Sequence, residues 1–137
     1  MNPFHIFVIE DDDVDYMNVE RSLKRINMTN PVTRAKDGVE AWKMLENGQI
    51  ETPTIVFLDL SMPKMDGHDF LKLLRANDKY KSIPVVIMTV STEESDKIGA
   101  FDTGVQGYIV KPMKFDHFVE VMSAINAYWT ISEIPNA

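Results

Sequence analysis

The sequence predicts an α/β fold in which a mostly parallel sheet carries helices on both faces. Five short apolar runs alternate with five amphipathic stretches along the 137 residues. Short, nearly continuous apolar runs are typical of strands buried on both faces, and their strict alternation with helices implies right-handed crossovers between parallel strands. A closed eight-stranded barrel needs about 250 residues. We therefore predict a flavodoxin-like, doubly wound sheet of five βα units with strand order 2-1-3-4-5.

Strands are expected where β-branched and apolar residues cluster between turn signals. The run Thr-Ile-Val-Phe-Leu at 54–58 is the clearest of them. The run at 32–36 is weaker, with Pro31 before it and the Asp37-Gly38 pair after it. In chain order, the five predicted strands are residues 4–9, 32–36, 54–58, 84–88 and 107–110.

Helices are expected where apolar residues recur every three or four positions. Asp13 is a candidate cap for the first helix, and Thr92, which two glutamates follow, is expected to cap the fourth. The predicted helices are residues 13–27, 39–47 and 70–76, a fourth helix opened by Thr92, and residues 115–129. We expect a single domain over residues 1–137, with a core of about 4–129 and a C-terminal extension at 130–137.

The composition excludes several classes of function. The chain has no cysteine, which excludes disulfides, thiolate metal sites and cysteine nucleophiles. With 14 basic and 21 acidic residues the net charge is −7, and no basic patch is visible that would attract a nucleic-acid backbone. No apolar run approaches the roughly 20 residues of a membrane span, and no signal peptide is visible. We expect a cytoplasmic protein that binds neither nucleic acid nor membrane.

Polar side chains follow four of the predicted strands at the point where each strand ends. These side chains are Glu10 and Asp11 after the first strand, Asp59 after the third, Thr89 after the fourth and Lys111 after the fifth. In the predicted order the first and third strands are neighbours, and ligands bind such sheets at the carboxyl ends of the strands. Three carboxylates, a hydroxyl and an ammonium group are therefore expected to converge on one crevice.

The chemistry of this set points to phosphoryl transfer beside a metal. Three nearby carboxylates repel one another unless a counter-charge is present, and Mg²⁺ is bound by carboxylates together with water and substrate phosphate. Lys111 and Thr89 are suited to contact two oxygens of a phosphoryl group. A carboxylate such as Asp59 can attack phosphorus to form an aspartyl phosphate.

Each of these residues also has an ordinary structural explanation when it is taken alone. Asp59 could be a polar strand end, Lys111 a surface lysine and Thr89 the cap of a turn. The remaining residues of the first acidic cluster are interpreted as a solvated loop face: Asp12, Asp13 and Asp15. The combination points to function, because the predicted fold independently places the whole set at one edge.

Four segments resemble the receiver domains of two-component response regulators, in order and at that family's spacing. They are Phe-Val-Ile-Glu-Asp-Asp at 7–12, Phe-Leu-Asp-Leu-Ser-Met-Pro-Lys-Met-Asp-Gly at 57–67, Ile-Pro-Val-Val-Ile-Met-Thr at 83–89 and Gly-Tyr-Ile-Val-Lys-Pro at 107–112. The resemblance implies that Asp59 is the phosphoacceptor. It implies that Asp59, Asp11 and the backbone carbonyl of Ser61 bind Mg²⁺, and that Glu10 does so largely through water.

The resemblance also implies the parts of a switch. Thr89 and Lys111 are expected to contact the phosphoryl group, and Tyr108 is expected to reorient on activation. The bond between Lys111 and Pro112 is expected to be cis, which proline makes accessible.

A narrower resemblance concerns the partner. The segments at 105–112, 115–120 and 127–135 resemble single-domain regulators that pair with bacterial phytochrome histidine kinases. This implies a sensor histidine kinase of the phytochrome type as partner and no attached output domain. It also implies a phosphoacceptor that acts on its own aspartyl phosphate, and not an enzyme with a separate substrate.

Three other functions are weighed against this interpretation. A haloacid-dehalogenase-type phosphatase carries a second aspartate two residues after its nucleophile, where this chain has Ser61. A flavodoxin-like electron carrier needs a phosphate-binding loop after the first strand, where this chain has acidic residues. A pseudo-receiver that has lost phosphorylation is disfavoured, and a measurement of phosphate uptake would decide. The residues that argue against it are the intact Asp11, Asp59, Thr89 and Lys111.

The C-terminal region predicts a homodimer through the face formed by the fourth helix, fifth strand and fifth helix. The fifth helix carries more apolar residues than one inward stripe can hold, and aromatic residues are favoured interface anchors. The residues concerned are Val119, Val121, Ala124, Tyr128, Trp129, Ile131 and Ile134. The alternative is that the tail folds back over its own domain and covers them.

Overall fold

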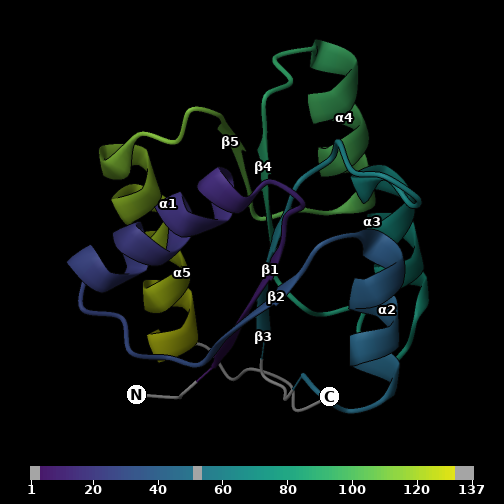
Figure 1. The fold of residues 1–137 in the computed structure, drawn as a ribbon, viewed down its shortest axis with the longest axis horizontal. Coiled ribbons are helices and arrows are strands. Elements are labelled where there is room, and N and C mark those ends of the chain that lie inside the picture. Colours follow the sequence, from purple (N-terminus) through teal and green to yellow (C-terminus); the bar gives the residue numbers. More distant parts are fainter. Residues whose placement is uncertain (1–3, 51–53, 132–137) are drawn as a thin grey trace.

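The five strands form one parallel sheet in the order β2-β1-β3-β4-β5, which confirms the predicted fold class (Figure 1). The structure is a computed structural model that describes residues 4–50 and 54–131, with side chains up to residue 124. All neighbouring strands pair in parallel. The strands are β1 His5–Ile9, β2 Val32–Ala35, β3 Thr54–Leu58, β4 Val85–Thr89 and β5 Gly107–Val110.

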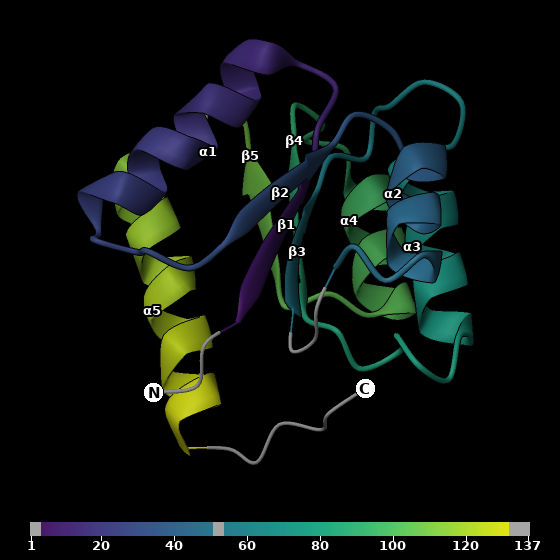
Figure 2. The ribbon, with the colours of Figure 1, turned by 60° about the horizontal axis from the view of Figure 1, so that its bottom comes forward.

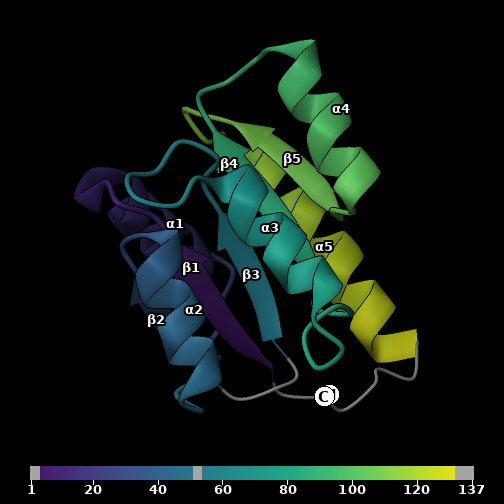
Figure 3. The ribbon, with the colours of Figure 1, turned by 90° about the vertical axis from the view of Figure 1, so that its right-hand side faces the viewer.

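Helices cover both faces of the sheet in two layers. They are α1 Asp13–Arg25, α2 Gly38–Glu46, α3 Gly67–Ala76, α4 Glu94–Thr103 and α5 Phe115–Ile131. Figure 2 shows α1 and α5 on one side of the sheet and α2, α3 and α4 on the other, and Figure 3 shows α2 and α3 in front of the strands with α5 behind.

Successive residues of the central strands point into the two layers in turn, as the period of a strand requires. Val56 and Leu58 of β3 belong to the core beneath α2, α3 and α4. Phe57, between them, belongs to the core beneath α1 and α5, where its ring stacks on that of Phe118 with centroids 5.9 Å apart. Both neighbours of Phe57 are fully buried on the opposite face. A shift of β3 by one residue would therefore move each of its side chains into the opposite layer.

Two predicted helix caps are wrong. Asp12, and not Asp13, caps α1, because the backbone of Asp12 is extended and its side chain accepts the N–H of Asp15 at 2.9 Å. Helix α4 begins at Glu94 after Glu93, one residue later than a Thr92 cap would place it, and Glu93 makes no capping hydrogen bond through its side chain.

Helix α3 begins three residues earlier than predicted, and its start fixes the end of β3. The carboxylate of Asp66 caps the helix by accepting the N–H of Asp69 at 2.9 Å. Gly67 then donates its N–H to the carbonyl of Leu60 at 2.9 Å. A Cβ atom on Gly67 would lie 2.4 Å from the carbonyl oxygen of Asp59 and 2.6 Å from the Cα of Leu60. Only glycine lets the helix start pass so close to the backbone of Asp59.

Part of the C-terminal prediction lies outside the described residues. Helix α5 continues to Ile131, two residues beyond the predicted end. Val119 and Val121 are half-buried and Ala124 is exposed, whereas the side chains of 125–131 and the residues 132–137 are not described. Within the described ranges, no helix is both long and apolar enough to cross a membrane.

We predict that Gly67→Ala lowers the free energy of unfolding by about 2 kcal/mol or more, because the new methyl group overlaps backbone that cannot rotate away. Gly99→Ala is the matched control. Its Cβ would lie 3.6 Å from the nearest atom, an ordinary contact, and alanine is favoured over glycine inside a helix by about 1 kcal/mol. Urea denaturation of both variants measures the difference. Equal stability would contradict the close approach of α3 to Asp59.

Candidate functional site

The polar residues predicted to converge do lie together at the carboxyl edge of the sheet. Backbone hydrogen bonds continue the strand pairing past the strand ends. Asp59 N–H donates to the Ile9 carbonyl at 3.1 Å, and Lys111 N–H donates to the Thr89 carbonyl at 2.7 Å. Thr89 is the last residue of β4, one residue later than the predicted strand end. The sheet itself therefore sets the relative positions of these residues.

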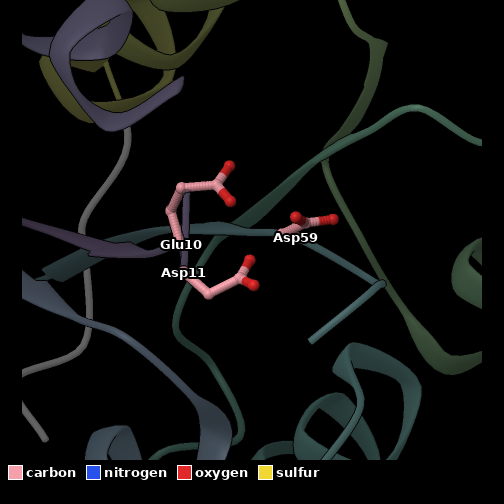
Figure 4. Close-up of side chains that lie close together, drawn as sticks. All are labelled: Glu10, Asp11 and Asp59. Atoms are coloured by element: carbon pink, nitrogen blue, oxygen red, sulfur yellow. The ribbon is translucent and has the colours of Figure 1, made fainter. Parts of the chain in front are cut away.

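Three carboxylates face a common space at this edge. Oxygen atoms of Glu10, Asp11 and Asp59 all lie within 4.8 Å of one another (Figure 4). Glu10 is fully buried, Asp59 is 5% exposed and Asp11 is exposed. Hard oxygen ligands of this kind suit Mg²⁺ or a similar divalent cation. Because Asp11 is exposed, the group of three carboxylates is accessible to solvent on that side.

Lys111 supplies the positive charge of the site. Its Nζ atom donates to Glu10 Oε1 at 2.5 Å, to Asp15 Oδ2 at 2.8 Å and to Asp59 Oδ2 at 3.1 Å. Its side chain is only 9% exposed. The bond between Lys111 and Pro112 is cis, as expected from the resemblance.

Asp15 is a site residue that the sequence analysis missed, and the interpretation of its cluster as a solvated face is wrong in this respect. Asp15 binds Lys111, Asp12 caps α1, and Asp13 forms an ion pair with Arg34 at 2.7 Å. Asp12 and Asp13 are exposed, but the side chain of Asp15 is only about a third exposed. Nothing in the sequence separates Asp15 from Asp12 and Asp13, because all three stand in the same acidic run after the first strand.

Burial and the neighbouring charged groups shift the pKa values of Glu10 and Lys111. Burial raises the pKa of Glu10 to about 8, and the nearby charge of Asp59 adds to this shift, although Lys111 opposes it through its hydrogen bond and charge. Burial acts against the charge of Lys111, but hydrogen bonds to Asp15 and Glu10 and the charge of Asp59 outweigh it, so the pKa of Lys111 is raised. The site therefore holds a fixed ammonium beside more negative charge than that ammonium balances.

Thr89 and Tyr108 are joined through the loop between β4 and α4. Thr89 is fully buried, and its hydroxyl accepts the N–H of Ser91 at 3.4 Å. The hydroxyl of Tyr108 donates to the carbonyl of Ser91 at 3.2 Å. Both residues of the predicted switch thus contact one residue of the loop.

A further contact of Ser91, made by its side chain, was not predicted. Its hydroxyl donates to Asp96, whose other carboxylate oxygen lies 3.0 Å from His68 Nε2. The hydrogen bonds from Ser91 and His68 lower the pKa of Asp96. The loop is thereby tied to both α3 and α4, and no sequence motif marks these residues.

The backbone of Ser61 contacts the carboxylate of Asp59. Its backbone N–H donates to Asp59 Oδ1 at 3.0 Å, so the two oxygens of Asp59 have different partners, Ser61 on one side and Lys111 on the other. Its carbonyl remains a predicted metal ligand.

Comparison with known proteins identifies the family. Residues 6–123 match the response regulator receiver domain. The chain belongs to this family. Receivers are phosphoacceptors of two-component signalling systems, and this membership argues against the phosphatase and the electron carrier as alternatives.

Similar receivers cover nearly the whole chain. A probable methanogenesis regulatory protein of Methanothrix harundinacea, FilR2, is 33% identical over 131 residues, which are 93% of this chain and 84% of FilR2. Response regulator Rcp1 of Synechocystis is 30% identical over 93% of this chain and 89% of its own length.

Two solved receivers share the fold closely. The Mn²⁺-bound structure of Rcp1 superposes with a TM-score of 0.80 and 28% identity over 97% of this chain and 99% of that chain. The phosphorylated cyanobacterial phytochrome response regulator RcpA gives a TM-score of 0.81 and 26% identity over 98% and 100%. The predicted resemblance to phytochrome-associated receivers is confirmed at this level.

Proposed function

We propose that this receiver accepts a phosphoryl group from a sensor histidine kinase onto Asp59, in a reaction that depends on Mg²⁺. One observation carries the proposal: the buried carboxylate of Asp59 lies 3.1 Å from the ammonium of Lys111 and within 4.8 Å of the carboxylates of Glu10 and Asp11. This arrangement supports a reaction in which a nucleophile, a fixed cation and a set of metal ligands act around one point.

The residues divide the chemistry between them. An oxygen of Asp59 forms the new bond to phosphorus while the bond from phosphorus to the donor's leaving group breaks, and the leaving group departs with that electron pair. Lys111 is positioned to bind one phosphoryl oxygen and the Thr89 hydroxyl to donate to another. Glu10, Asp11, Asp59 and the carbonyl of Ser61 would hold Mg²⁺. When bound, the cation would offset the negative charge of these carboxylates and of the phosphoryl group.

The phytochrome-type kinase is the partner that the comparisons favour. RcpA is described as a phytochrome response regulator, and its phosphorylated form and the Mn²⁺-bound form of Rcp1 share this fold over nearly their whole length. These likenesses support the same kind of partner and a divalent cation for this chain. The activity is that of a phosphoacceptor within a single receiver domain over residues 1–137.

The loop between β4 and α4 offers a route from the site to the surface. A phosphoryl group that binds the Thr89 hydroxyl would compete with the Ser91 N–H, which donates to that hydroxyl in this structure. Ser91 is also the acceptor for Tyr108. Phosphorylation would shift the population of loop conformations, because its bonds to Thr89 and Lys111 exist only in the phosphorylated form.

We predict that acetyl phosphate adds one phosphoryl group to the protein when Mg²⁺ is present, because the site supplies its own nucleophile and charge. Intact mass spectrometry should detect it. Asp59→Asn should abolish the addition, and Asp13→Asn, which removes a charge outside the site, should not. Addition that persists in Asp59→Asn, or in EDTA, would contradict the mechanism.

We predict that Thr89→Ala accepts phosphate but loses the response of the loop, because no hydroxyl remains to bind the phosphoryl group. NMR shifts induced at Tyr108 by beryllofluoride, a phosphoryl mimic, should largely disappear in this variant. Thr89→Ser keeps the hydroxyl and should retain most of the shifts. Shifts of wild-type size in Thr89→Ala would refute the coupling.

We also propose that the receiver forms a homodimer through α4, β5 and α5. Ile98 and Phe101 of α4 are 57% and 54% exposed, which supports an interaction surface there. Light scattering of the full chain at tens of micromolar should give a dimer that Phe101→Asp disrupts. Leu73→Asp on α3, where Leu73 is 41% exposed, is the matched control. A monomeric wild-type protein, both free and with beryllofluoride, would end this proposal.

A further inference from the structure

Lys111 has a partner that the proposed chemistry does not use. A lysine ammonium carries three N–H donors, and here each has a carboxylate acceptor: Glu10, Asp15 and Asp59. Two of these carboxylates also belong to the group that could hold a metal, together with Asp11. Asp15 does not belong to that group, so its charge is directed to Lys111 alone.

The position of Asp15 is fixed by its own helix start. Its backbone N–H donates to Asp12 Oδ1 at 2.9 Å, and the N–H of Asp12 donates to Glu10 Oε2 at 3.3 Å. The other oxygen of Glu10 accepts from Lys111, which also donates to Asp15. A closed ring of hydrogen bonds therefore runs from the end of β1 through the cap of α1 to Lys111 and back.

The three carboxylates do not remain equal during the reaction. Asp59 becomes an acyl phosphate and loses its carboxylate charge. A cation bound by the metal group would attract the carboxylate of Glu10 and compete with Lys111 for it. Asp15 is the one partner of Lys111 whose charge the reaction leaves unchanged. Its bond to Lys111 is formed largely out of solvent, because the lysine side chain is 9% exposed and that of Asp15 34%.

We propose that Asp15 is a positioning residue for phosphoryl transfer, which holds the ammonium of Lys111 over the Asp59 carboxylate before and during the reaction. The inference rests on the proposed function, since it assigns Asp15 a role in phosphorylation at Asp59. It differs from an ordinary surface ion pair, which contributes little even to stability. It also differs from a tether that keeps Lys111 away from the phosphoryl group, because Lys111 already reaches Asp59 while it is bound to Asp15.

The kinetic test compares Asp15→Asn with Asp13→Asn. Both variants remove one charge from the first turn of α1, but Asp13 pairs with Arg34 and not with Lys111. At saturating Mg²⁺, the rate of phosphorylation by acetyl phosphate should fall about tenfold in Asp15→Asn, as expected when a hydrogen bond between two charged groups is replaced by one to a neutral amide oxygen. Mg²⁺ affinity, measured by calorimetry, should agree between the two variants within about twofold, since both charges lie outside the metal group.

A second measurement does not depend on phosphorylation. In a ¹⁵N-lysine NMR spectrum, the ammonium of Lys111 should give a slowly exchanging signal, assigned by its absence in Lys111→Arg. The signal should broaden or vanish in Asp15→Asn and persist in Asp13→Asn. Loss of this signal in Asp15→Asn alone would show that Asp15 positions Lys111, whether or not the protein takes up phosphate. A wild-type protein that takes up no phosphate would refute the proposed function separately.

Three results would overturn the inference. The first is an Asp15→Asn variant that is phosphorylated as fast as Asp13→Asn, and the second is one that is phosphorylated faster than the wild type, which would indicate a tether. The third is a Lys111 signal that is unchanged in Asp15→Asn.

Discussion

The buried ammonium of Lys111 is the constraint on which the whole site depends. Glu10 is fully buried and Asp59 nearly so, and a buried charge without a partner is costly. Lys111 is the cation hydrogen-bonded to both. It comes from the end of β5 at one edge of the sheet, whereas Glu10 comes from β1, with β3 and β4 between them. The carboxylates are therefore compensated only when the sheet is complete, which couples the site to the fold.

The packing of the two cores fixes the positions of these charged residues. Residues of β3 alternate between the layers, and both layers are fully buried at Val56, Phe57 and Leu58. A strand held on both faces cannot slip, so the residue after Leu58 has a fixed place. The start of α3 adds a second restraint, since Gly67 lies against the backbone of Asp59. The nucleophile is thus held by its strand from one side and by a helix start from the other.

The sequence pattern predicted the strand order and the convergence of the site residues. It did not predict the helix caps or the contact of Asp15, which depend on backbone dihedral angles and on the folded chain. Five apolar runs were enough for the strand order, and the order was enough to bring Glu10, Asp59 and Lys111 to one edge. The caps of α1 and α4 were misassigned because several adjacent acidic or hydroxyl residues can each cap a helix, and backbone dihedral angles choose among them. The contact of Asp15 with Lys111 joins residues 96 positions apart. Composition makes Asp15 look like its exposed neighbours, so only the folded chain distinguishes it.

Helix α4 is the element best suited to respond to the site. Ala100 is its one buried residue, whereas α3 buries four. Its N-cap makes no side-chain hydrogen bond, in contrast to those of α1, α2 and α3. Elements with few buried contacts open at low free-energy cost and supply the moving parts of switches. Near the start of α4, Asp96 contacts both Ser91 and His68, and Ser91 also contacts Thr89 and Tyr108. A small change at Thr89 therefore acts on the helix whose position the core fixes least, and this helix carries the exposed Ile98 and Phe101.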